Sequence, residues 1–219
     1  MPRLSQPAMS DAAAVIAAAR ALDAAGFMPS KSGNLSQRTP RGFHITASGM
    51  PYAQAGVEDL VELALDGTTL AGQRLPSSEW RLHADIYAAR PDAQAIVHTH
   101  SPHATALSCA RRPIPALHYM VAMAGGNDIP CSAYATFGTP DLAKACLAAL
   151  AGRRACLLAN HGVVAIGATL AGADMLAREV ENLARQYLLL LAAGLPPVLL
   201  DGAQLQAVAM QFRGYGRPA

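Results

Sequence analysis

AIVHTHSP, residues 95–102, joins a buried strand, a pair of histidines and the start of a helix. The apolar, β-branched run over residues 95–98 predicts a strand that continues out of the core through Thr99 and His100. Ser101 then occupies a helix cap and Pro102 the first helical turn, where the missing N–H removes no hydrogen bond.

Strands and helices alternate on both sides of this segment. Caps, tight turns and hydrophobic periodicity predict helices over residues 10–26, 79–89, 141–150 and 171–193, and strands over residues 35–38, 42–47, 61–65, 155–159 and 163–166. No linker, repeat or shift in composition divides the sequence. We therefore expect one α/β domain over residues 1–219.

The composition argues for an oligomer and against a nucleic-acid-binding protein. Charged residues make up only 15% of the chain, against about 25% in a typical globular protein. A surface so poor in charge suggests that other subunits cover part of it. The net charge is +2 and the basic residues are scattered, so no basic stripe for nucleic acid is present.

The sequence predicts a cytoplasmic protein with no membrane segment. The four cysteines show no CxxC spacing, which is typical of buried thiols in a reducing compartment. Asp11, Arg20 and Asp23 interrupt the alanine-rich N-terminal stretch, which is not compatible with a signal-peptide core. The most apolar run, residues 187–200, is broken by glycine and proline and is too short to span a bilayer.

Three histidines form a candidate metal site. Because side chains alternate along a strand, His98 and His100 point to the same side, as two metal-binding imidazoles would. Such a pair is a weak signal by itself, since core and surface strands also contain it. His161 strengthens the signal, because it lies in a tight Asn-His-Gly turn where an unpartnered buried imidazole would be unfavourable. Three imidazoles leave one position of a tetrahedral zinc open, as in catalytic sites. The remaining histidines lack such pairing and are interpreted as structural, with His103 also a candidate supporting residue behind the ligands: His44, His83, His103 and His118.

Glu79 and three loops of small residues complete the candidate site. Glu79 begins a helix, where a carboxylate either caps the helix or acts as a general base beside a metal, and spacing alone does not separate the two roles. The loops at residues 32–34, 48–49 and 77–78 offer hydroxyls and backbone N–H groups that hold phosphate without charge. Each loop alone is equally an ordinary turn. Lys31 places a positive charge next to the first of them.

Eight segments in a fixed order identify a family. They are Ser32-Gly33-Asn34, ITASGMPY (residues 45–52), LPSSEWR (75–81), IVHTH (96–100), IPALHYM (114–120), Gly125-Gly126-Asn127, YATFGT (134–139) and Asn160-His161-Gly162. Together these segments resemble the class II aldolase and adducin family, and within it most closely the members that cleave L-fuculose 1-phosphate. The resemblance extends over nearly the whole chain.

The resemblance implies a metal site with one zinc ion per chain. The implied ligands are Glu79, His98, His100 and His161. When substrate displaces Glu79 from the metal, this glutamate becomes the catalytic base.

Further roles follow from the same resemblance. The positions that match the family's phosphate site are Gly33, Asn34, Ser48, Gly49, Ser77 and Ser78. Tyr119 matches a catalytic tyrosine that reaches in from a neighbouring subunit. Tyr215 matches a second one on a mobile C-terminal tail, here about residues 205–219.

The family also implies a fold, an assembly and a reaction. Its members have a three-layer α/β/α fold with a central, mostly antiparallel sheet, and form homotetramers with active sites at subunit boundaries. The implied reaction is retro-aldol cleavage of a ketose 1-phosphate to dihydroxyacetone phosphate and a small aldehyde such as L-lactaldehyde. Zinc acts as the Lewis acid for the negative charge that develops next to the ketone.

One departure leaves the substrate open. Lys31 stands where members that cleave L-fuculose 1-phosphate typically have threonine, and siblings cleave 5-deoxyribulose or methylthioribulose 1-phosphate. A sugar-phosphate dehydratase or decarboxylase of the same fold is a further alternative. L-ribulose-5-phosphate 4-epimerases typically have aspartate at the position of Glu79, and non-enzymatic adducin-like domains lack the full metal set, so both fit the sequence less well.

Overall fold

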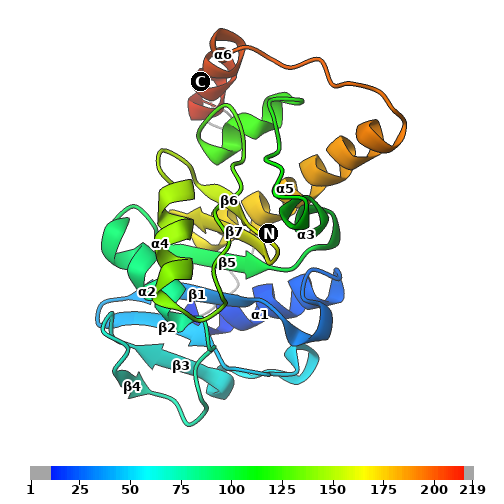
Figure 1. The fold of residues 1–219 in the computed structure, drawn as a ribbon. Helices are drawn as coiled ribbons and strands as arrows, with labels where there is room; N and C mark the ends of the chain where they lie inside the picture. Colours follow the sequence, from blue (N-terminus) through cyan, green and yellow to red (C-terminus); the bar gives the residue numbers. More distant parts are fainter. Residues whose placement is uncertain (1–10, 215–219) are drawn as a thin grey trace, which may run out of the picture.

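Short apolar segments separated by tight turns form a seven-stranded sheet in the computed structural model, which describes residues 11–214 (Figure 1). The strand order is β4-β3-β2-β1-β5-β7-β6, and every neighbouring pair is antiparallel. The strands are β1 (Asn34–Thr39), β2 (Gly42–Thr46), β3 (Leu60–Leu63), β4 (Thr69–Ala71), β5 (Ala95–Thr99), β6 (Ala155–Leu158) and β7 (Gly162–Gly167).

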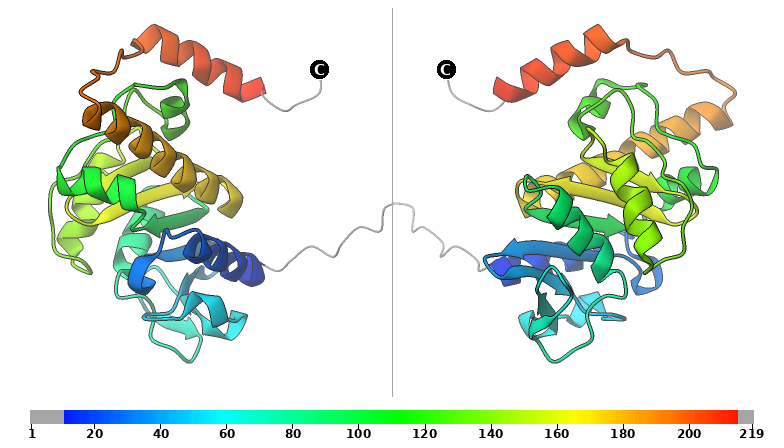
Figure 2. Two further views of the ribbon diagram at one scale, coloured as in Figure 1. Left: turned by 90° about the vertical axis from the view of Figure 1, so that its right-hand side faces the viewer. Right: turned by 60° about the vertical axis from the view of Figure 1, so that its left-hand side comes forward.

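Helices cover both faces of the sheet, so the molecule has three layers (Figures 1 and 2). Helices α2 and α4 pack against each other on one face, while α1 and α5 lie on the opposite face. The α-helices are α1 (Asp11–Ala24), α2 (Trp80–Ala89), α3 (Pro102–Cys109), α4 (Pro140–Ala149), α5 (Leu170–Ala192) and α6 (Gly202–Gly214). Four short 3-10 helices are η1 (Pro29–Lys31), η2 (Tyr52–Gln54), η3 (Val57–Asp59) and η4 (Tyr119–Ala124). This architecture confirms the predicted three-layer α/β fold.

The centre of the sheet positions the candidate site. Every residue of β5 is buried, because helices cover both of its faces. Asn34 at the start of β1 pairs with His98 on β5, and Thr99 pairs with Val163 near the start of β7. The beginnings of β1 and β7 therefore lie on either side of the end of β5, where the sequence places its histidine pair.

Two elements differ from the sequence-based prediction. Strand β4 is only three residues long and none of them is fully buried, so no hydrophobic alternation marks it. Helix α6 occupies most of the segment that the family resemblance treats as a mobile tail, and it packs on η4 through Leu205. Tyr215 lies outside the described residues. No helix within residues 11–214 is long and apolar enough to cross a membrane.

Candidate metal centre

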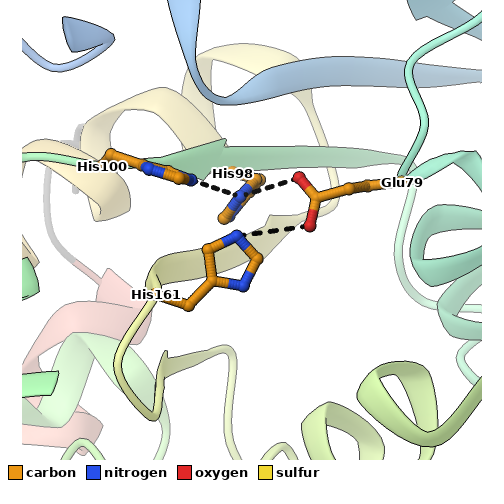
Figure 3. A group of neighbouring side chains, drawn as sticks. All are labelled: Glu79, His98, His100 and His161. Atoms are coloured by element: carbon orange, nitrogen blue, oxygen red, sulfur yellow. Dashed lines mark hydrogen bonds and ion pairs between the residues drawn. The ribbon is translucent and has the colours of Figure 1, made fainter. Parts of the chain in front are cut away.

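Three histidines and one glutamate converge at the end of the central strand β5 (Figure 3). Each of the four side chains contributes one ligand atom, and these atoms all lie within 4.8 Å of one another. Glu79 Oε2 is 3.1 Å from His98 Nε2, and Glu79 Oε1 is 3.3 Å from His161 Nε2. The Nε2 atoms of His98 and His100 are 3.1 Å apart. The structure thus brings all four predicted metal ligands together.

The antiparallel pairing of β5 with β7 explains how His161 reaches the other two histidines. It directly precedes β7, in a turn where Asn160 adopts a left-handed conformation with φ 56°. A Cβ atom at Gly162 would lie 2.4 Å from the carbonyl oxygen of Thr99. Only glycine lets the turn approach β5 this closely, so the Asn-His-Gly sequence is what places the third imidazole.

Glu79 comes from the turn before α2, and its side chain faces the histidines (Figure 3). It occupies the N-cap position of α2 but forms no capping hydrogen bond. Its exposed fraction is only 6%. The structure therefore does not support helix capping as the role of Glu79.

The arrangement of donor atoms fits a bound cation. His98 Nδ1–H donates to the carbonyl of Val163 at 2.8 Å, so the lone pair of neutral His98 Nε2 faces the carboxylate of Glu79. Two such acceptors repel each other unless a proton or a metal ion lies between them. Glu79 Oε1 is also buried without a hydrogen-bond partner among the described residues. Tetrahedral zinc with Zn–N bonds of 2.0–2.1 Å holds its ligand atoms about 3.3 Å apart, and the three shortest separations given above, 3.1, 3.3 and 3.1 Å, are close to this value.

The same contacts shift the pKa values of the group. Burial would raise the pKa of Glu79, but the adjacent His98 and His161 outweigh it and hold that pKa well below its usual range. Burial lowers the pKa of His100 to about 3 and that of His161 to about 4. Burial also acts to lower the pKa of His98, but the Glu79 carboxylate more than offsets this and raises it. The ionised Glu79 and the neutral His100 and His161 are in the forms that bind zinc, while His98 binds zinc only after it loses its proton.

A cavity of about 310 Å³ opens beside the metal group. Glu79, His100 and His161 line it. All three loops of small residues line it as well, through Gly33, Asn34, Ser48, Gly49, Ser77 and Ser78. The structure therefore collects the predicted phosphate-binding residues at one place, next to the metal group.

Hydrogen bonds hold these loops and leave some donors free. Tyr52 donates from its hydroxyl to the carbonyl of Gly33 at 2.7 Å, and Ser77 Oγ accepts from the backbone N–H of Glu79 at 3.3 Å. The backbone N–H groups of Gly49 and Ser78 make no hydrogen bond to any other described residue. Free N–H groups at a turn are suited to a phosphate oxygen.

Lys31 is the one lysine or arginine among the described residues that line the cavity. It is exposed, and both Lys31 and the preceding Ser30 have left-handed backbones, with φ 62° and 56°. The other loop residues are neutral. A positive charge at this position can offset part of the charge of a bound phosphate.

Two described residues that the sequence analysis considers, Tyr119 and His103, do not join the metal group. Tyr119 lies on η4, is 48% exposed, does not line the cavity and packs its ring against His118. His103 pairs instead with Glu181 of α5, at 2.6 Å. Tyr215 is outside the described residues. Within one chain, Tyr119 therefore neither joins the metal group nor lines the cavity beside it.

His83 belongs to the site although the sequence analysis interpreted it as structural. It is fully buried, and its Nε2 lies 2.5 Å from Asn34 Oδ1. Asn34 in turn donates from Nδ2 to Glu79 Oε2 at 3.0 Å. The sequence contains a signal for this contact, because His83 follows Glu79, the N-cap of α2, by four residues, a spacing that brings side chains to one side of a helix. Tyr134 and Phe137 also line the cavity, a role that their place in the YATFGT motif does not predict.

Comparisons with known proteins agree with this site. Residues 13–188 match the family described as the Class II Aldolase and Adducin N-terminal domain. The chain is 50% identical over 202 residues to a 5-methylthioribulose-1-phosphate/5-deoxyribulose-1-phosphate aldolase of Rhodospirillum rubrum, covering 92% of this chain and 90% of the relative. It is 44% identical over 191 residues to an L-fuculose phosphate aldolase of Escherichia coli, covering 87% and 88% of the two chains. A solved structure of an L-fuculose 1-phosphate aldolase superposes with a TM-score of 0.89 at 38% identity, over 94% of this chain and 98% of the other.

Proposed function

Because the chain belongs to the class II aldolase and adducin family, whose aldolases are metal-dependent, we propose that it cleaves a ketose 1-phosphate with zinc as its metal. The products are dihydroxyacetone phosphate and a small aldehyde. The observation that carries the proposal is the position of Glu79, which touches the metal-binding histidines on one side and lines the cavity of the three small-residue loops on the other.

Proton transfers in this reaction are assigned to Glu79 and Tyr119. In the condensation direction Glu79 removes a proton from the carbon next to the ketone of dihydroxyacetone phosphate, and Tyr119 of a neighbouring subunit donates one to the aldehyde oxygen. Cleavage reverses both transfers. The lowered pKa of Glu79 keeps its carboxylate ionised, which is the form in which a general base begins the reaction. Tyr215 is assigned a catalytic role on family resemblance alone.

Binding and charge stabilisation complete the mechanism. The phosphate lies among the loops of the cavity, with Lys31 as its cationic partner, and this grip holds the reacting carbon next to Glu79. Zinc, when bound, supplies the Lewis acid for the negative charge that develops next to the ketone. Tyr134 and Phe137 give the cavity an aromatic side, which suits a substrate whose far end is apolar.

Two kinds of substrate are candidates. The relative of Rhodospirillum rubrum, at 50% identity, is named for 5-methylthioribulose and 5-deoxyribulose 1-phosphates, and the relative of Escherichia coli, at 44%, for L-fuculose phosphate. We place the 5-methylthioribulose and 5-deoxyribulose 1-phosphates first, because the Rhodospirillum rubrum relative has the higher identity. In addition, Lys31 stands where proteins that cleave L-fuculose 1-phosphate typically have threonine. L-fuculose 1-phosphate, which the motifs alone favour, is the second candidate.

A panel of substrates tests the proposed reaction. The zinc-loaded protein should release dihydroxyacetone phosphate from 5-deoxyribulose, 5-methylthioribulose or L-fuculose 1-phosphate, with the highest kcat/KM on one of the first two. A coupled glycerol-3-phosphate dehydrogenase assay measures the product. Loss of substrate without dihydroxyacetone phosphate would favour the dehydratase or decarboxylase alternative. If none of the three sugar phosphates is turned over, the proposed function is wrong.

The proposed location is the cytoplasm. All four cysteines are free in the structure, including Cys146 and Cys156, whose Sγ atoms lie 3.7 Å apart. Buried thiols that remain unlinked at this separation are typical of a reducing compartment.

The proposed assembly is a homotetramer with active sites at subunit boundaries. An apolar groove runs between η4, α5 and α6, and its lining includes Tyr119, Met123, Met175 and Phe212. Met175 is 57% exposed and Tyr119 48%. Apolar side chains gathered at an exposed groove are a feature of subunit interfaces. Since Tyr119 does not line the cavity of its own chain, an interface at this groove would bring it to the site of another chain.

Mixing two inactive variants tests this arrangement. Tyr119→Phe removes only a hydroxyl, so it should slow cleavage while sparing zinc content and assembly. A Tyr119→Phe protein and a Glu79→Gln protein, dissociated and reassembled together, should recover activity, because some boundaries then pair an intact Glu79 with an intact Tyr119. Each variant mixed with itself is the control and should recover nothing. If subunit exchange is proven and the mixture stays inactive, Tyr119 acts within its own chain or not at all.

A further inference from the structure

A buried chain of hydrogen bonds runs behind the metal group, from Tyr87 near the C-terminal end of α2 to Glu79. Tyr87 Oη lies 2.8 Å from Ser36 Oγ, which lies 2.6 Å from His83 Nδ1. The other ring nitrogen, His83 Nε2, lies 2.5 Å from Asn34 Oδ1. Asn34 Nδ2 then reaches Glu79 Oε2 at 3.0 Å. All five side chains are at most 6% exposed, so water does not compete for these bonds.

The carboxylate at one end fixes the direction of every bond. An ionised Glu79 only accepts, so Asn34 must present its NH₂ group to Glu79 and its carbonyl oxygen to His83. His83 Nε2 must therefore carry the proton, and Nδ1 accepts from the hydroxyl of Ser36. That hydroxyl oxygen in turn accepts from Tyr87. Each group has one role, and the imidazole is held in a single tautomer.

Burial keeps this imidazole neutral. It lowers the pKa of His83 to about 3, with the nearby His98 acting in the same direction and the Glu79 carboxylate opposing it. A neutral ring with a donor at Nε2 and an acceptor at Nδ1 matches both neighbours. A protonated ring would present a second donor to Ser36, whose hydroxyl would then have to turn away from it.

We propose that His83 is a positioning residue, which locks the side-chain amide of Asn34 so that one N–H group holds the base Glu79 and the other faces the phosphate loops. This inference rests on the proposed function, because it takes Glu79 as the base and the loops as the phosphate site. Asn34 lines the cavity, and its second N–H hydrogen has no partner among the described residues. The side-chain amide of Asn34 thus connects Glu79 with the loops proposed to bind phosphate. Without the donor at His83 Nε2, the amide is free to flip and turn its oxygen toward the carboxylate.

Two isosteric substitutions separate the two hydrogen bonds of His83. Glutamine places its amide nitrogen near the position of Nε2, so His83→Gln keeps a donor to Asn34 and gives up the acceptor for Ser36. Asparagine places its oxygen near Nδ1, so His83→Asn keeps the contact with Ser36 and gives up the donor to Asn34. Each variant removes one bond from the same buried position, so a purely structural role predicts similar losses in both.

The expected results differ between the two variants. His83→Asn should lower kcat about tenfold and weaken binding of inorganic phosphate about tenfold, the scale of one buried hydrogen bond. His83→Gln should keep most of the activity and phosphate affinity, even if its melting temperature is lowered as much as that of His83→Asn. Zinc content, measured by elemental analysis, should stay near one per chain in both. Equal losses in the two variants, or losses that track the melting temperature, would overturn the proposal.

A double-mutant cycle tests whether His83 acts through Asn34. On an Asn34→Ala background, His83→Asn should produce no further loss of phosphate affinity or kcat, because the group it positions is gone. Additive losses would contradict the inference. Phosphate binding, followed by calorimetry on the zinc-loaded protein, is measured independently of turnover. If the wild-type protein cleaves none of the three sugar phosphates, the proposed function fails. The phosphate affinities of the variants still test the positioning role of His83 in that case.

Discussion

The purified protein should hold about one zinc ion per chain, and His161→Ala should lose both the metal and at least about 10³-fold of the cleavage activity. Three imidazoles and a carboxylate close a tetrahedral zinc site, and removal of one imidazole leaves that set incomplete. A bound zinc ion, acting as a Lewis acid, stabilises the developing negative charge by several kcal/mol. Loss of this stabilisation accounts for the expected loss of activity. His161 sits in a turn rather than in the sheet, so its removal should leave the fold intact. Elemental analysis, turnover and circular dichroism on one preparation measure all three properties.

A matched control uses a histidine outside the metal group. His44 lies on β2, is half-buried, and its Nδ1 has no hydrogen-bond partner among the described residues. His44→Ala should therefore keep its zinc and its activity. His98→Ala should lose the metal as well, and also some stability, because it leaves the buried carbonyl of Val163 without its partner. Absence of bound divalent metal in gently purified wild-type protein, together with no response to added zinc, would refute the metal site.

Glu79→Gln should reduce turnover by roughly 10²–10⁴-fold, the usual scale for loss of a general base. Glutamine keeps the shape of the side chain, and its carbonyl oxygen can still accept the hydrogen bond from Asn34. It cannot accept the substrate proton. Zinc should remain, since the three histidines are untouched. Steady-state kinetics on the best substrate of the panel measure the effect, with zinc content determined on the same sample.

The control for Glu79→Gln is a second buried carboxylate. Glu62 on β3 pairs with Arg41 and Thr39 and has no contact with the metal group among the described residues. Glu62→Gln should change turnover little. Near-normal turnover in Glu79→Gln would reduce Glu79 to a structural carboxylate beside the metal.

Most of the sheet and the metal ligands could be predicted from local sequence. The strands around the His-x-His pair and the Asn-His-Gly turn are continuous apolar runs, since both faces of the sheet are covered. Strand β4 was not predicted, because its residues are largely exposed and no alternation of apolar and polar residues distinguishes them from a loop. Helix α6 was not predicted, because the family resemblance treats this segment as a mobile tail. Its Leu205, Val208 and Phe212 do recur at helical spacing, and they belong to one packed cluster.

The supporting residues behind the metal could not be predicted in the same way. His83 looks like any core histidine, because its two partners, Asn34 and Ser36, come from a strand more than forty residues earlier. Only the pairing of β1 with β5 places that strand beside the metal ligands. The cap of α3 gives a second example. Ser101 was expected to supply it, yet the carboxylate of Glu181 takes the N–H groups of His103 and Ala104.

The central position of β5 also determines how the polypeptide can acquire its metal. β5 pairs with β1 through residues 34 and 98, and with β7 through residues 99 and 163. Both pairings join distant segments, so two long loops must close before the middle of the sheet exists. The ligands meet only in that finished sheet, and an ion that binds there slows unfolding while leaving the folding rate unchanged. If zinc is the metal, as proposed, its supply should change the lifetime of the folded protein in the cell and not the rate at which the protein folds.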